Sequence, residues 1–504
     1  MNYRSPVLSV VLKGHDFSRA ANSSRKAWAL APEGVFSRSF RQVSYLFILS
    51  AVALLIALAP LPCSGQSTPS QPSLAAPATP PPAQAYSLPP GKLAKAITLN
   101  RIRTALEIVD SLWGLAFLWI LLATRWAASL AAWAERLLPR RWMQGLLFFA
   151  AFLLISTLAS LPLDAIGHTA SLHYGISVQG WASWLGDVAK SLGVSLLIGP
   201  PILLLFNWIV RISPRRYWLW AWAVSLPLIV LTVLAEPLLE PVFNNFEPLA
   251  KTHPALVVRL EEVVARTGTS ISPDRMYLMK ASAKSNGLNA YVTGIGATTR
   301  FVLWDTATDR LPDDEVLFIF GHESGHYVLN HIPKELAGSF VGMFILFWCC
   351  AAVASWLARR FGARWQLGGI EISQTPLGAP PIAHFAMGGK PTTPLASRQG
   401  FLVLLLTLSA ASFLLQPASN AFSRHFEHEA DIYGQEAIHS LVADPQQTAV
   451  SAFNRMGEAW LEDPNPSPFI EFWSYSHPSV QHRAEFAAHY NPWANCGRGR
   501  FFEK

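Results

Sequence analysis

Two histidines and a glutamate stand close together in the segment FGHESGHYVLNH, residues 320–331. In a helix, His322 and His326 lie one turn apart on the same face, so both imidazoles can bind one zinc ion. Glu323 lies about 100° further around that helix, where a carboxylate can act as general base toward a zinc-activated water. The pattern predicts a metal-dependent hydrolytic site, although the same spacing also arises by chance as a polar helical face.

A zinc ion with one open position needs a third protein ligand. His331 follows His322 by nine residues and is out of phase with it on a helix, so we interpret His331 as a solvated or membrane-interface histidine. The segment SRHFEHEADIYG offers Glu427 and Asp431, four residues apart on one helical face. One of these two can complete the site while the other accepts a hydrogen bond from a ligand imidazole. Their spacing does not decide between them.

The composition places these residues in a membrane protein. The chain has 504 residues, of which 51% are hydrophobic and only 14% charged, which is more apolar than a water-facing surface tolerates. The net charge of +7 is divided among short clusters beside apolar runs, which argues against nucleic acid as a partner. None of the four cysteines, Cys63, Cys349, Cys350 and Cys496, has the spacing of a thiolate metal site, and we interpret Cys349 and Cys350 as small buried hydrophobes.

Seven apolar runs are close to the roughly 20 residues that a helix needs to cross a bilayer. They are Val43 to Leu61, Leu106 to Thr124, Trp142 to Leu161, Leu192 to Val210, Tyr217 to Ala235, Ala337 to Leu357 and Gly400 to Leu415. We interpret the first as a retained helix rather than a cleaved signal peptide because its apolar core is long. Five runs therefore precede the histidine motif and two follow it.

The water-compatible segments predict a small α+β head built from two separated pieces. Before the motif, PALVVRLEEVVARTG has helical periodicity, RMYLMKAS, NAYVTGI and RFVLWDT are short strand-like runs, and DDEVLFIFGHESGHYVLNHI is helical again. The expected divisions are a basic extension (1–40), a first helix or signal anchor (41–62), a Pro-rich linker (63–104), a four-helix membrane region (105–235), the head (236–335), a transmembrane hairpin with a Gly/Pro-rich insert (336–422) and the C-terminal part of the head (423–504).

The combination of HESGH, SRHFEHEAD, WSYSHPSVQHR and PVFNNFEPL resembles the Ste24-type CAAX prenyl proteases of the M48 metallopeptidase family. The order of five apolar runs, head, two runs and tail is also similar to that family's seven-helix plan. The resemblance implies a zincin-like (gluzincin) catalytic head in which His322, His326 and Glu427 bind one zinc ion. It further implies that Glu323 is the base and that Asp431 is a carboxylate behind the ligands, sometimes described in the family as a proton donor.

The same resemblance extends to the substrate side of the site. It implies that Asn289, Ala290 and Tyr291 form an edge strand to which a peptide adds by main-chain hydrogen bonds. His477 and Arg483 match the family's tail motif, and they would stabilise an oxyanion or anchor the site.

These observations predict an integral-membrane zinc endopeptidase acting on peptide or membrane-protein substrates at a lipid bilayer, in CAAX-type or quality-control proteolysis. We expect a multi-pass protein of the inner cell membrane, since no C-terminal ER-retention signal is present. The distribution of basic loops places the head outside the cytoplasm, whereas the resemblance implies a cytosolic head. The alternatives are a non-catalytic scaffold or binding protein that retains the protease fold, and a transporter, which the apolar runs alone would suggest.

Overall fold

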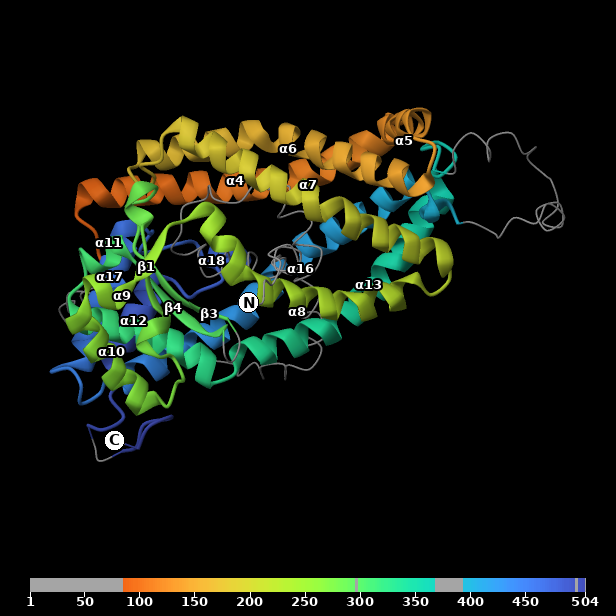
Figure 1. The fold of residues 1–504 in the computed structure, drawn as a ribbon. Coiled ribbons are helices and arrows are strands. Elements are labelled where there is room, and N and C mark those ends of the chain that lie inside the picture. Colours follow the sequence, from red (N-terminus) through yellow and green to blue (C-terminus); the bar gives the residue numbers. More distant parts are fainter. Residues whose placement is uncertain (1–84, 295–297, 368–392, 495–496, 504) are drawn as a thin grey trace, which may run out of the picture.

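The structure is a computed structural model that describes residues 85–294, 298–367, 393–494 and 497–503. Long helices form an elongated bundle, and a small α+β head lies at one end of it (Figure 1). The first expected apolar run, Val43 to Leu61, lies outside the described residues, as do most of the Gly/Pro-rich insert and both Cys63 and Cys496.

Six helices of the described chain are long and apolar enough to cross a membrane. They are α4 (Pro90–Ala123), α6 (Arg141–His173), α7 (Trp181–Ile212), α8 (Tyr217–Phe243), α13 (His331–Phe361) and α16 (Arg398–Ala437). The short helix α5 (Trp126–Leu137) links α4 to α6. Six of the seven expected runs lie in these helices, which confirms the expected fold class of a helical membrane protein.

Helix α4 begins earlier than the sequence pattern indicated. It starts at Pro90, inside the stretch 63–104 that was expected to be an extended linker. Proline is compatible with the first turn of a helix because its missing N–H would have no partner within the helix.

Large apolar side chains cover the outside of the bundle, among them Leu197, Trp220 and Leu414. This exposure suits helices surrounded by hydrocarbon, where apolar side chains need no burial against protein. Cys349 also faces outward on α13, whereas its neighbour Cys350 is buried. The expectation that both are buried was therefore wrong for Cys349, because consecutive residues of a helix point in directions about 100° apart.

The head contains a four-stranded sheet with the strand order β1-β2-β4-β3. The strands are β1 (Phe246–Pro248), β2 (Met276–Met279), β3 (Ala290–Thr293) and β4 (Arg300–Trp304). Strands β2 and β4 pair in parallel and the other two pairs are antiparallel, so β3 lies at one edge. The three strand-like runs of the sequence are confirmed, while β1 was not foreseen in the segment PVFNNFEPL.

Helices surround this sheet and complete the head. They are α9 (Leu249–Thr252), α10 (Pro254–Thr267), α11 (Asp305–Thr308), α12 (Asp313–Val328), α17 (Pro445–Trp460), α18 (Pro468–Ser474) and α19 (Val480–His489). Phe320 of α12 packs edge-on against Phe301 of β4, and Phe318 packs against Phe453 of α17. Helix α12 is therefore held between the sheet and the C-terminal helices.

Helix α12 also crosses the last part of α16, which extends from the bundle into the head (Figure 1). Glycines allow this close approach. A Cβ atom at Gly321 would lie 3.2 Å from the Cα atom of Gly434, and a Cβ atom at Gly434 would lie 2.8 Å from the backbone nitrogen of His322. The crossing thus brings the His-Glu-x-x-His motif against a helix about a hundred residues later in the chain.

Candidate metal centre

Helix α12 directs the two motif histidines toward one point. The Nε2 atoms of His322 and His326 lie 3.2 Å apart, and both side chains are buried. This is the arrangement expected of histidines four residues apart on one helical face.

Glu427 of α16 faces both imidazoles from the opposite side. Its Oε2 atom lies 3.3 Å from Nε2 of His322, and its Oε1 atom lies 3.5 Å from Nε2 of His326. The three side chains form a buried group whose ligand atoms lie within 4.8 Å of one another, so they could hold a metal ion. Two imidazole nitrogens and one carboxylate oxygen are a donor set that suits zinc in a catalytic site.

Glu323 lies between this group and the edge strand. Its Oε2 atom accepts a hydrogen bond from the backbone N–H of Val292 in β3, at 3.4 Å, and its Oε1 atom is 4.0 Å from Nε2 of His322. The carboxylate therefore borders the three candidate ligands on the side where β3 has its free edge.

Asp431 lies behind His322 rather than in front of it. Its Oδ1 atom is 2.9 Å from Nδ1 of His322. Arg483 of α19 binds the same carboxylate through two hydrogen bonds, from Nε to Oδ2 at 2.9 Å and from Nη2 to Oδ1 at 2.6 Å. The guanidinium group also lies over the ring of Phe453. Arg483 thus binds Asp431, and its Nη2 atom also lies 3.9 Å from Oε2 of Glu427.

The carboxylates around His322 change its protonation. Burial alone would lower the pKa of this imidazole, but the contacts with Asp431 and Glu427 outweigh burial and raise the pKa from 6.5 to about 9. A metal ion that bound Nε2 of His322 at neutral pH would therefore have to displace a proton.

His477 reaches the site from the segment before α19. Its Nε2 atom is 3.2 Å from Oε2 of Glu427, and its Nδ1 atom is 3.0 Å from the hydroxyl of Ser476. The side chain is buried. His477 consequently contacts one of the three candidate ligands, Glu427.

Asn289, Ala290 and Tyr291 lie at and just before the start of β3, the edge strand. The backbone carbonyl of Asn289 accepts a hydrogen bond from Trp304 N–H, which ties this segment to β4. Burial and then the charge of Glu240 raise the pKa of the Tyr291 hydroxyl well above its usual value. The Tyr291 side chain therefore faces the end of α8, while its backbone belongs to the strand beside Glu323.

The interpretation of His331 as solvated or interfacial was wrong. Its side chain is 1% exposed, its Nδ1 atom is 3.1 Å from Nδ1 of His326, and its ring stacks on Phe426. The Nε2 atom lies 3.4 Å from Oε2 of Glu429. His331 and Glu429 are thus neighbours of the metal group that sequence reasoning missed.

The interpretation of His331 was wrong because the chain breaks between two helices just before this residue. Helix α12 ends at Val328, and Asn330 adopts a left-handed conformation with φ of 55° before α13 begins at His331. Phase on one continuous helix therefore does not apply to His331. The one signal in the sequence was Asn330 itself, because asparagine tolerates the left-handed conformation that often ends a helix.

Two family models and several known proteins are similar to this chain. Residues 260–491 match Peptidase family M48, and residues 71–245 match the family described as CAAX prenyl protease N-terminal, five membrane helices. The chain is 32% identical over 400 residues to the uncharacterized metalloprotease YhfN of Bacillus subtilis, covering 79% of this chain and 86% of that relative. It is 26% identical to CAAX prenyl protease 1 of Saccharomyces cerevisiae, over 68% of this chain and 71% of the relative.

The fold is also similar to a solved structure. The crystal structure of S. mikatae Ste24p aligns with a TM-score of 0.66 and 22% sequence identity, covering 80% of this chain and 90% of that chain. The membrane bundle and the head thus share one architecture with that protein.

Proposed function

The chain belongs to peptidase family M48 as a Ste24-type membrane zinc metalloendopeptidase, and from this premise we propose how its own residues cleave a peptide bond. His322, His326 and Glu427 hold one zinc ion, and the buried group of two imidazoles and one carboxylate supports this assignment. When bound there, zinc supplies a Lewis acid that acidifies water and polarises a carbonyl group.

Glu323 is the general base in this proposal. It accepts a proton from the attacking water and gives it to the leaving amine. The position of its carboxylate, 4.0 Å from His322 Nε2 and hydrogen-bonded to Val292 of the edge strand, supports the role because both a water and a peptide carbonyl would be within its reach.

The substrate peptide adds to the free edge of β3 as an extra strand, beside the backbone of Asn289, Ala290 and Tyr291. The edge position of β3 supports this, since a strand with one unpaired side offers N–H and C=O groups in register. The peptide bond to be cleaved would then pass in front of Glu323.

His477 and Arg483 have different roles in the proposal. His477, 3.2 Å from Glu427, donates a hydrogen bond to the oxygen that becomes negative as the carbonyl is attacked. Arg483 anchors the site through its two hydrogen bonds to Asp431, which in turn orients the His322 ring.

The substrates we propose are peptide segments at the membrane surface, because the head lies directly on the membrane helices. Several relatives carry the name CAAX prenyl protease 1, which favours CAAX-type processing, and quality-control proteolysis of membrane proteins is the second candidate. The membrane we propose is the inner cell membrane. A role as a non-catalytic scaffold is not favoured, since all the residues that the mechanism needs are present.

The test is a comparison of wild type with Glu323→Gln, using purified protein, bound-zinc analysis and the membrane-proteome peptides of expressing cells. We expect Glu323→Gln to retain one zinc ion per chain and to lose cleavage by at least about 100-fold, the lower range of general-base contributions. Glu261→Gln, an exposed position on α10, is the matched control and should cleave normally. Equal cleavage by wild type and Glu323→Gln would overturn the mechanism.

A further inference from the structure

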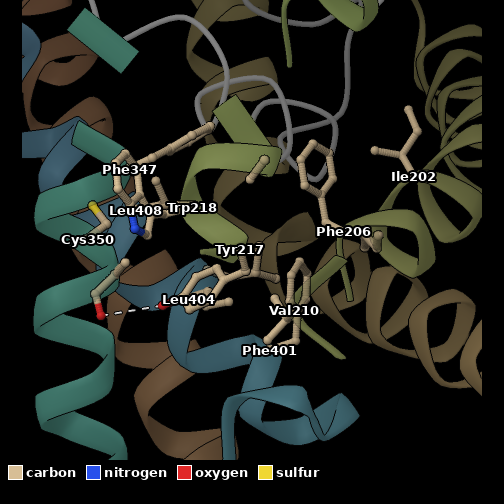
Figure 2. Close-up of a pocket in the computed structure, with 14 residues that line it drawn as sticks. Ile202, Phe206, Val210, Tyr217, Trp218, Phe347, Cys350, Phe401, Leu404 and Leu408 are labelled. Carbon is tan, nitrogen blue, oxygen red and sulfur yellow. Dashed lines mark hydrogen bonds between the residues drawn. The ribbon is translucent and has the colours of Figure 1, made fainter. Parts of the chain in front are cut away.

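An apolar cavity lies between α7, α8, α13 and α16 in the membrane bundle, away from the metal centre. Figure 2 shows Phe206 of α7 on one side of it, Phe347 of α13 on the other, and Tyr217 with Phe401 at its lower end. The Tyr217 hydroxyl contacts the carbonyl of Ala351 at 3.4 Å, so even this polar group is directed at protein.

One end of the cavity lies at a strongly basic end of the bundle. Val210 and Tyr217 line the cavity and directly flank segment 211–216, the end of α7 and the turn after it, which contains Arg211, Arg215 and Arg216. Phe401, another lining residue, is one helical turn beyond Arg398.

Acidic side chains of the protein do not neutralise the arginines of segment 211–216. Within the described residues, Arg211, Arg215 and Arg216 form no ion pair with an acidic side chain, and the charged neighbours of Arg211 are Arg141 and Arg398. Arg398 is already paired with Glu135, at 2.6 Å. This end of the bundle, next to the cavity, therefore carries an excess of positive charge.

We propose that the cavity binds one acyl chain of an anionic phospholipid whose phosphate group contacts the arginines of segment 211–216. An acyl chain gains no hydrophobic energy by leaving the bilayer for an equally apolar cavity. Selectivity must therefore come from the headgroup, and basic pockets between transmembrane helices are known binding sites for anionic headgroups. Each arginine should raise the affinity for the anionic lipid, relative to a zwitterionic lipid, by roughly fivefold. The three arginines together should raise it by about 100-fold.

The experiment reconstitutes the full chain with phosphatidylglycerol or phosphatidylcholine and measures retained lipid by native mass spectrometry. Wild type should retain phosphatidylglycerol. In the variant Arg211→Gln/Arg215→Gln/Arg216→Gln, the preference for phosphatidylglycerol over phosphatidylcholine should fall by about 100-fold. The variant Ala351→Phe fills the cavity and should lose the bound lipid although all three arginines are present. Thermal melting verifies that each variant is folded.

The control removes the same charge elsewhere at this end of the bundle. Arg359→Gln/Arg360→Gln/Arg364→Gln changes the end of α13 and the loop after it, and this variant should retain phosphatidylglycerol as wild type does. Equal retention of phosphatidylcholine by wild type, or an equal loss in the control variant, would overturn the proposed site.

A separate observation concerns His326 and rests on the proposed metal site. Because Nε2 of His326 faces His322 and Glu427, its Nδ1 atom must carry the ring proton when Nε2 binds a metal. That Nδ1 atom is 3.1 Å from Nδ1 of His331. The His331 Nδ1 atom can accept a hydrogen bond from the His326 Nδ1–H group only if the proton of His331 is on Nε2. The Nε2 atom of His331 in turn faces Glu429 at 3.4 Å.

We infer that His331 is a positioning residue that fixes the tautomer and ring orientation of His326. Glu429 holds His331 in the required tautomer, and Arg500 of the C-terminal segment pairs with Glu429. The two ligand histidines are thus oriented differently, since His322 contacts the carboxylate of Asp431 directly while His326 contacts Glu429 only through a second imidazole.

The test measures zinc affinity by competition with a chelator. His331→Phe retains an aromatic ring against Phe426 but neither nitrogen, and it should weaken zinc binding 10- to 100-fold, as is typical for the loss of such partners. His331→Asn restores an acceptor for the His326 proton and should recover most of the affinity. Melting of the zinc-free variants should stay near wild type.

The matched control is His168→Phe, which changes a buried histidine of α6 that stacks on Trp184 of α7 and should leave zinc affinity unchanged. Wild-type affinity in His331→Phe, or an equal loss in His331→Asn, would overturn the positioning role. Absence of zinc binding in wild type would instead contradict the proposed function itself.

Discussion

The backbone of Gly434 in α16 lies directly against the backbone of His322 in α12. A Cβ atom at Gly434 would be 2.8 Å from the nitrogen of His322 and 3.1 Å from its Cα atom. Both neighbours are backbone atoms of a buried helix, so they cannot rotate away as a flexible side chain could. The distance between the motif histidines and Glu427 therefore depends on the absence of a side chain at position 434.

We expect Gly434→Ala to separate α12 from α16, and so to weaken zinc binding and lower the melting temperature. Overpacking of this kind costs about 1–3 kcal/mol. Gly338→Ala in α13 is the control, because a Cβ atom there would meet nothing within 4 Å. That control should be neutral or stabilising by up to about 1 kcal/mol, since alanine favours a helix more than glycine does. Equal melting and zinc content in both variants would contradict the role of this crossing.

Glu427→Gln should weaken zinc binding by more than about 100-fold, although the motif HESGH is unchanged. The neutral amide is a poorer ligand than a carboxylate, and the loss of a direct ligand should exceed the effect of a residue behind one. Chelator competition measures the affinity, with the exposed Glu458→Gln as the control. Undiminished affinity would exclude Glu427 as a ligand.

Asp431→Asn should weaken zinc binding 10- to 100-fold and also destabilise the fold. The substitution leaves the buried Arg483 without its carboxylate, and breaking one side of a buried ion pair costs about 3–5 kcal/mol. The double variant Asp431→Asn/Arg483→Met should recover stability but not zinc affinity. A double-mutant cycle of melting temperatures tests this, and additive losses would contradict coupling between the two residues.

The zinc-free protein should become less stable as the pH rises from about 6.5 to about 9. The folded pKa of His322 is raised from 6.5 to about 9, because the contacts with Asp431 and Glu427 outweigh burial. Its protonated form therefore stabilises the fold fully below pH 6.5, and this contribution of about 3 kcal/mol is lost as pH passes through the folded pKa. Melting curves in chelator at a series of pH values measure the loss. His322→Gln should remove most of this pH dependence, and an unchanged profile would contradict the assignment.

Much of the fold follows from local patterns of residues. The apolar runs predicted six of the described membrane helices because span length depends only on bilayer thickness. The three strand-like runs predicted β2, β3 and β4 for a similar reason, since alternation and strand-forming residues act over a few positions. The prediction for His331 was wrong because it assumed that one helix continued through Asn330.

By itself, the sequence determined that this is a membrane protein with His322, Glu323 and His326 on one helix, since hydrophobic length and helical spacing are properties of short segments. It also brought Glu427 and Asp431 onto one helical face. Only the tertiary structure decided that Glu427 faces the Nε2 atoms while Asp431 faces Nδ1 of His322, and that His331 lies behind His326. The physical reason is that these relations depend on how closely α12 and α16 cross, and that distance is set by contacts between residues about a hundred positions apart.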